Sequence, residues 1–116
     1  MIELVLYREI LYLNAVGNFT DIYLKHGRTE RVRRTMDAIL EELNSDFFRS
    51  HRSYIINLAE DRRILRGKNN TYAVIIGDSE SSAANADHGG THQGIEIPLS
   101  RSRYNVLKNI LSDSVE

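Results

Sequence analysis

The stretch FFRSHRSYIIN, residues 47–57, constrains the fold of this chain more than any other. Its adjacent aromatic side chains, Phe47 and Phe48, require an apolar environment, and the segment Tyr54 to Ile56 is typical of a buried strand. Between them, Arg49 to Ser53 provide side chains of the kinds that contact phosphates and base edges. A short polar loop held at both ends by core residues suits binding better than covalent chemistry. A solvated turn between two strands would have the same pattern, so this stretch alone leaves both interpretations open.

Most of the remaining chain alternates short apolar segments with turn residues. The pairs Gly17-Asn18 and His26-Gly27 tolerate a positive φ angle and therefore favour tight turns. Strands that are joined by such turns pair in the antiparallel sense. Pro98 confines the last strand to a sheet edge or a strand end. The pattern predicts strands in residues 1–7, 10–16, 19–25, 28–34, 54–56, 71–77 and 95–99, and residues 64–65 favour the start of another.

Two segments change to the helical period. Residues 35–43 and 100–111 each place apolar side chains on one helical face. Thr35 is a suitable N-cap for the first helix, and Ser100 or Ser102 for the second. The predicted fold class is therefore mainly β with two short helices, and it is not a helix-turn-helix. The two apolar faces consist of Met36, Ile39, Leu40 and Leu43, and of Tyr104, Leu107, Ile110 and Leu111.

The length of 116 residues fits one domain, residues 1–116, with a sizeable core. Residues 78–94 are polar and rich in glycine, which predicts a mobile loop within that domain. The absence of cysteine excludes disulfides and thiolate metal sites. No apolar run approaches the roughly 20 residues of a membrane span, and the first residues lack the pattern of a signal peptide. We therefore expect a soluble, cytoplasmic protein.

The net charge of −1 argues against indiscriminate binding of nucleic acid, but the charges are unevenly distributed. Residues 47–68 carry six cationic side chains against two acidic ones, whereas residues 77–96 carry four acidic side chains and no Lys or Arg. The cations are mostly arginine, 12 against 3 lysines, and the planar guanidinium makes bidentate contacts with phosphate and guanine. The acidic residues of the first helix are expected to face water, away from the basic residues: Asp37, Glu41 and Glu42.

Patterns for catalysis and metal binding are weak. Ser50, His51 and Ser53 lie close together in sequence, but neighbours on a strand point to opposite faces, and no G-x-S-x-G turn accompanies them. A further set has a spacing that is known for zinc ligands but lies in a glycine-rich segment without a rigid frame: Asp87, His88 and His92. We therefore expect no enzymatic activity, no cofactor and no metal site.

The strongest candidate site combines polar residues from three predicted turns or helix starts. Asn and Arg pair bidentately with adenine and guanine, and a helix N-terminus attracts phosphate. A small β-rich module that binds a ligand or a protein is the alternative, and a steep salt dependence of binding would favour DNA. The candidate DNA-binding residues are Asn18 in the first hairpin turn, Arg49, His51 and Arg52 in the central loop, and Ser100, Arg101 and Arg103 at the start of the last helix.

Three segments resemble the LytTR-type DNA-binding domain: ILYLNAVGNFTDIYL, FFRSHRSYIINL and IPLSRSRYNVLKNIL. The resemblance covers residues 1–76 and 95–111, and the central segment is the most specific. It implies an elongated, mostly antiparallel β-β-β arrangement with small helices. It also implies sequence-specific binding of double-stranded DNA in transcription regulation, through loops that enter successive major grooves. Domains of this family usually form the output half of bacterial two-component response regulators.

Residue by residue, the resemblance assigns the contact of the first hairpin turn to Asn18. It assigns the contacts of the central loop to His51 and Arg52, and the last contact to Arg101, beside Arg103. The family often binds paired direct repeats, which a homodimer on DNA would suit.

Overall fold

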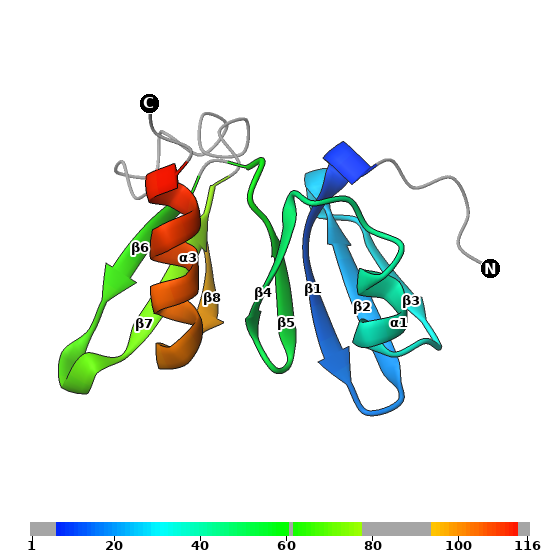
Figure 1. Ribbon diagram of the computed structural model, residues 1–116. Helices are drawn as coiled ribbons and strands as arrows, with labels where there is room; N and C mark the ends of the chain where they lie inside the picture. The colour runs from blue at the N-terminus through cyan, green and yellow to red at the C-terminus, as the bar shows by residue number, and fades with distance from the viewer. Residues whose placement is uncertain (1–6, 61, 78–93, 114–116) are drawn as a thin grey trace.

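Two antiparallel sheets and two α-helices form the part of the chain that the computed structural model describes, residues 7–60, 62–77 and 94–113 (Figure 1). The five-stranded sheet has the order β3-β2-β1-β5-β4 and the three-stranded sheet the order β6-β7-β8. This confirms the predicted fold class. The first sheet contains β1 (Ile10–Val16), β2 (Phe19–Leu24), β3 (Thr29–Val32), β4 (Phe47–His51) and β5 (Tyr54–Asn57). The second contains β6 (Arg62–Arg66), β7 (Tyr72–Ile76) and β8 (Ile95–Leu99), and the helices are α1 (Met36–Leu40) and α3 (Arg101–Asp113).

Strands β4 and β5 are buried on both faces because neighbouring residues enter two different cores. Phe47 and Ile55 join the core beneath α1, whereas Phe48 and Ile56 join the core beneath α3. Side chains alternate across a strand, so each adjacent apolar pair supplies one residue to each core. The first core contains Ile10, Leu13, Ile22, Leu24, Met36, Ile39, Phe47 and Ile55. The second contains Leu11, Phe48, Ile56, Val74, Ile76, Ile97, Leu99 and Leu107.

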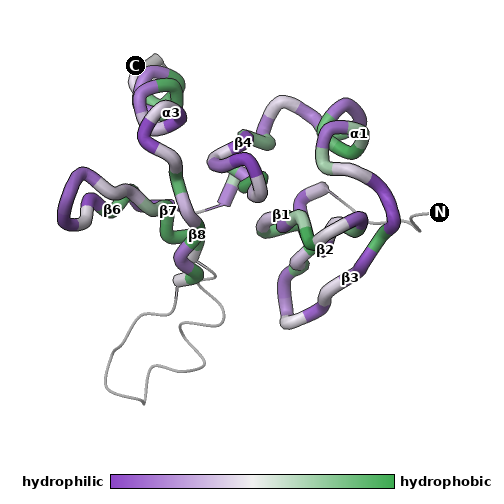
Figure 2. The backbone as a smooth tube through the Cα atoms, turned by 90° about the horizontal axis from the view of Figure 1, so that it is seen from below, coloured by the Kyte–Doolittle hydropathy of each residue, from purple (hydrophilic) through white to green (hydrophobic). Residues whose placement is uncertain are grey.

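The pairing of the strands brings three chain junctions to one edge of the molecule, the lower edge in Figure 1. The β1–β2 turn and the β4–β5 turn meet there, because the Ala15 amide donates to the Ser53 carbonyl at 2.9 Å. The start of α3 joins them, because the Ser100 amide donates to the Ser50 carbonyl at 2.9 Å. Seen from below, the hydrophilic tip of the β4–β5 hairpin lies between α3 and the β1–β2 hairpin (Figure 2).

Both helices form, but their ends differ from the prediction. Helix α1 has only five residues and ends at Leu40, before the predicted end at Leu43. Acidic side chains are unfavourable near a helix C-terminus, and Glu41 and Glu42 follow directly. The predicted N-cap is confirmed, since the Thr35 hydroxyl accepts from the Ala38 amide at 3.1 Å.

Helix α3 is longer than predicted and continues to Asp113. The Ser100 hydroxyl accepts a long hydrogen bond of 3.4 Å from the Arg103 amide, so Ser100 takes the capping position. Leu107 is fully buried as expected. The prediction for Ile110 is wrong, because 40% of its surface is exposed, whereas the next residue, Leu111, packs against the second core.

The prediction of a polar loop over residues 49–53 is wrong, because the loop is shorter. Arg49, Ser50 and His51 belong to β4, which leaves only Arg52 and Ser53 in the turn. The two cores on either side of Phe47 and Phe48 hold the following residues in a strand, although their side chains are polar. Polarity alone therefore gave a misleading signal at this point.

The other strands agree with the prediction within a few residues. Strand β6 begins at Arg62, earlier than the expected start at Ile64, and β8 lies at the edge of its sheet, as Pro98 requires. The first predicted strand lies outside the described residues except for Tyr7, which is in a 3-10 helix (Tyr7–Glu9). The predicted loop at 78–94 also lies outside them apart from Gly94. Among the described helices, none is long and apolar enough to cross a membrane.

Candidate nucleic-acid interface

The β1–β2 hairpin ends in a two-residue turn, Gly17-Asn18, flanked by the pair Val16 and Phe19. Gly17 has a φ angle of 59°, which favours glycine. A hairpin turn with glycine at the first central position matches the right-handed twist of its strands. The exposed side chain of Asn18 is thus held at the tip of a hairpin whose turn depends on the backbone alone.

The β4–β5 hairpin also has a two-residue turn, but neither Arg52 nor Ser53 has a positive φ angle. Tight hairpin turns normally need one. Here the register shifts between Arg49 and His51, which indicates a β-bulge that adjusts the strands. The Arg49 side chain also holds the turn: Nε donates to the His51 carbonyl at 3.2 Å, and Nη2 donates to the Arg52 carbonyl at 2.6 Å.

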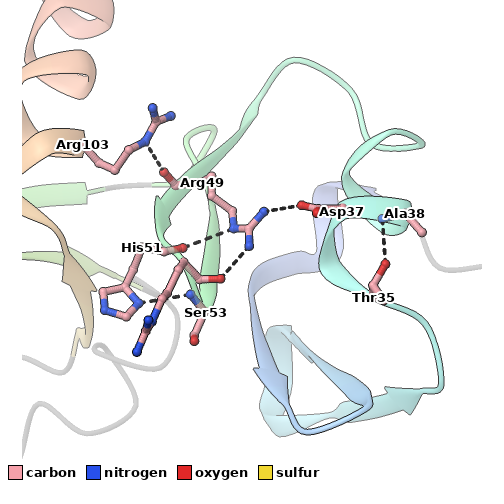
Figure 3. Close-up of polar contacts among 8 residues, drawn as sticks. Thr35, Asp37, Ala38, Arg49, His51, Ser53 and Arg103 are labelled. Atoms are coloured by element: carbon pink, nitrogen blue, oxygen red, sulfur yellow. Dashed lines mark hydrogen bonds and ion pairs between the residues drawn. The ribbon is translucent and has the colours of Figure 1, made fainter.

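The same guanidinium also contacts α1. Arg49 Nη1 lies 2.7 Å from Asp37 Oδ1, and a dashed line marks this contact in Figure 3. Asp37 is exposed to water as expected, with 85% of its side chain accessible. The expectation that it lies away from the basic residues is wrong, because it pairs with one of them across 12 positions of sequence.

On the other side of β4, Arg103 connects the hairpin to α3 (Figure 3). Its Nε donates to the Arg49 carbonyl at 2.8 Å. Its guanidinium carbon lies 4.7 Å from the centre of the Phe48 ring, within the range of a cation–π contact. Together with the amide bond from Ser100 to Ser50, these contacts fix the start of α3 against the central hairpin.

His51 uses one ring nitrogen in a hydrogen bond within the protein. Its Nδ1 accepts from the Ser53 amide at 3.1 Å, so a neutral His51 carries its proton on Nε2. The ring packs edge-on against Tyr54 at 5.8 Å between centroids.

A neighbouring ring, Tyr12, stacks on Tyr23 at 4.4 Å between centroids. Burial, followed by the nearby Tyr23, raises the pKa of Tyr12 to about 12. Tyr12 therefore stays uncharged under physiological conditions.

These elements surround an open cleft of about 540 Å³, called the basic cleft below. The N-terminal end of α3 adds a positive dipole to its arginines. Arg52 at the hairpin tip and Arg101 on the first turn of α3 are exposed and make no side-chain hydrogen bond or ion pair with other described residues. Their guanidinium groups are available to a partner. The cleft is lined by Arg49, His51, Arg52, Ser100, Ser102 and Arg103.

The structure thus brings most of the predicted site residues together. Arg101 belongs to the same helix start but does not line the cleft, and Asn18 lies on the neighbouring hairpin tip. Sequence reasoning missed Ser102 as a lining residue, although it stands within the same Ser-Arg-Ser-Arg segment. It also missed the contact of Asp37, for which neither spacing nor composition gives a signal. The residues with the spacing of zinc ligands, Asp87, His88 and His92, for which no metal site was expected, lie outside the described residues.

A mainly β domain with a basic cleft at one edge has the features of a nucleic-acid-binding module. A family model described as the LytTr DNA-binding domain matches residues 1–86, which is more than half of the chain. The protein therefore belongs to the LytTR DNA-binding domain family, a non-catalytic family whose membership implies DNA binding in transcription regulation.

A solved structure agrees with this fold. It is the LytTr DNA-binding domain of a Bacillus cereus protein described as a methyl-accepting/DNA response regulator. The match has a TM-score of 0.70 and 21% sequence identity, and it covers 92% of this chain and 84% of that chain. No curated protein sequence matches this chain. The helix start at Ser100 to Arg103 lies beyond the residues that the family model matches.

Proposed function

We propose that this domain recognises specific double-stranded DNA sequences by placing its lower edge along successive major grooves. The main support is the meeting of three structured junctions at that edge: the β1–β2 turn, the β4–β5 turn and the start of α3. Each junction presents Asn or Arg, the side chains best suited to reading adenine and guanine. Because the junctions are joined by backbone hydrogen bonds, their side chains keep a fixed spacing.

The roles within the interface follow from which groups are available. Arg52 and Arg101 contact bases, because their guanidinium groups are exposed and unengaged among the described residues. Asn18 contacts an adenine from the first hairpin tip. His51 donates from Nε2 to a base or a phosphate oxygen.

The remaining residues serve the phosphate backbone. Arg49 and Arg103 each use donors inside the protein, and of the five N–H groups of Arg49 two remain for a phosphate. Ser100, with the α3 N-terminus, receives a second phosphate, where the helix dipole favours negative charge. This division accounts for DNA binding by a chain of net charge −1, since Arg49, Arg52, Arg101 and Arg103 all lie at the central hairpin and the start of α3.

The same proposal includes the biological setting. The domain is the output domain of a bacterial two-component response regulator, works in the cytoplasm, and forms a homodimer on paired direct repeats. The description of the Bacillus cereus structure as part of a response regulator supports this context.

Selection from a random duplex library, followed by sequencing, tests sequence recognition. Affinity for the selected duplex and for a random duplex is then measured over a range of salt concentrations. About 4–6 phosphate contacts are expected for a domain of this size, which gives a slope of log affinity against log salt of about −4 to −5. A slope near zero on both duplexes would overturn the proposal and favour a ligand- or protein-binding module.

A further inference from the structure

We infer that Asp37 determines the sequence specificity of this domain by positioning Arg52 through Arg49, without contacting DNA itself. The inference rests on the proposed function, because it concerns the precision of the same interface. Three links carry it: α1 holds Asp37, Asp37 holds Arg49, and Arg49 holds the turn that presents Arg52.

The first link is the rigidity of α1. Thr35 caps the helix through the Ala38 amide, and Met36 and Ile39 are buried in the first core. Asp37 lies between the two buried residues and therefore projects from a fixed position, although its own side chain is exposed. A carboxylate that projects from a rigid helix can orient a partner side chain without being buried itself.

The second and third links form one continuous set of hydrogen bonds. Asp37 Oδ1 accepts from Arg49 Nη1 at 2.7 Å, and the same guanidinium donates to the carbonyls of His51 and Arg52 at 3.2 and 2.6 Å. A guanidinium is planar, so fixing one edge of it fixes the direction of its other donors. Without the carboxylate, the arginine would still carry its charge but would be free to leave the turn.

The sign of the expected effect separates positioning from simple electrostatics. An exposed carboxylate beside a DNA-binding edge repels phosphates, so its removal alone should tighten binding to every duplex. If Asp37 positions the turn, its removal should weaken binding to the preferred duplex, where Arg52 must meet a base edge. Binding to a random duplex should not weaken, because phosphate contacts need less precise geometry.

Glu41 provides a matched control. It is an exposed acid that directly follows α1, and it makes no side-chain hydrogen bond or ion pair with other described residues. The variant Glu41→Ala removes the same charge from the same region without disturbing Arg49. Its effect therefore measures repulsion alone.

The experiment uses the full chain with Asp37→Ala, Asp37→Glu and Glu41→Ala, each measured against the selected duplex, a scrambled duplex and thermal unfolding. Asp37→Ala should weaken binding to the selected duplex about tenfold, near the lower end of the range for one bidentate base contact. Its affinity for the scrambled duplex should stay the same or rise. Asp37→Glu, which keeps the carboxylate, should restore part of the lost discrimination. Glu41→Ala should tighten both complexes equally, by at most about twofold.

Equal tightening of both complexes by Asp37→Ala, as with Glu41→Ala, would show that Asp37 acts only by repulsion and would overturn the inference. Equal weakening of both complexes together with a lower melting temperature would assign Asp37 to folding, which also overturns it. If the unaltered chain fails to discriminate between the duplexes, the proposed function itself is wrong. The unaltered chain therefore separates the two failures.

Discussion

The two hairpins at the lower edge of the molecule have turns of equal length but are built differently. In the β1–β2 hairpin, Gly17 adopts a positive φ angle and the backbone closes the turn by itself. In the β4–β5 hairpin, neither turn residue does so, and the Arg49 side chain bonds to two carbonyls of the turn instead. The first turn is a local property of its sequence, whereas the second depends on residues from other elements.

This difference affects what each hairpin can do. A turn closed by glycine keeps its shape whatever surrounds it, and it presents Asn18 without help. The central turn is tied to α1 through Asp37 and to α3 through Arg103, so the position of Arg52 depends on both helices. The central hairpin is thus the place where distant parts of the domain can influence recognition.

The largest effect is expected from changing the exposed tip of the central hairpin. Arg52→Ala should cost about 1–3 kcal/mol of binding free energy on the preferred duplex and relax the preference at one base position. Its melting temperature should not change, because the side chain makes no bond with other described residues. Asn18→Ala makes the same test for the first hairpin. Equal losses on selected and random duplexes would assign either residue to phosphate contact instead.

Removing the side chain that holds the central turn should have the next largest effect. Arg49→Ala removes hydrogen bonds to two carbonyls and one carboxylate. The Arg49 side chain that makes them is partly exposed to solvent. We expect a loss of about 2 kcal/mol in the free energy of unfolding, measured by urea denaturation. Arg101→Ala is the control, since it removes an equal charge that has no partner among the described residues. If the two variants are equally stable, the turn does not need Arg49.

The corresponding substitution in the first hairpin should reduce the free energy of unfolding by a smaller amount. Gly17→Ala forces a side chain into a positive φ angle, although no heavy atom lies within 4 Å of the added carbon. The cost is therefore conformational only, about 1 kcal/mol in the free energy of unfolding. Preference at the base position proposed for Asn18 should weaken, and preference at the position proposed for Arg52 should remain. A loss of preference at both positions would mean that the hairpins are not independent.

The sequence predicted the first turn correctly and the extent of the central turn incorrectly, because the first turn is set locally and the central turn is not. Gly17-Asn18 was recognisable as a turn because the signal lies in the two residues themselves. The extent of the central turn was not, because β4 continues through Arg49 to His51 under the influence of two cores that only the folded chain creates. The candidate site was proposed from the residue types at three turns or helix starts and from the family resemblance, but neither of them indicated the pairing of Asp37 with Arg49. No periodicity connects an acid on a helix to an arginine on a strand 12 residues later.

The first hairpin has a charged contact too, but it connects β2 to the edge strand β3 and not to the turn. Arg31 donates to both carboxylate oxygens of Asp21, from Nε at 2.6 Å and from Nη2 at 3.0 Å. Asp21 is buried, and the hydrogen bonds from Arg31 hold its pKa below the ordinary value of 3.8. A carboxyl group whose pKa is lowered by folding stabilises the folded state. This stabilisation is complete at pH values above the ordinary pKa, and it is lost as the pH falls through the lowered pKa.

The last prediction follows from that sign. Asp21→Asn should lower the melting temperature at pH 7, and the difference from the unaltered chain should shrink steadily as the pH falls below about 4. Thermal unfolding of both proteins between pH 7 and pH 2 measures it. Because the contact lies away from the Gly17-Asn18 turn, Asp21→Asn should leave the base preference of Asn18 unchanged at neutral pH. A difference in melting temperature that stays constant with pH would show that the carboxylate charge does not hold β3, and a changed base preference would show that β3 supports the tip.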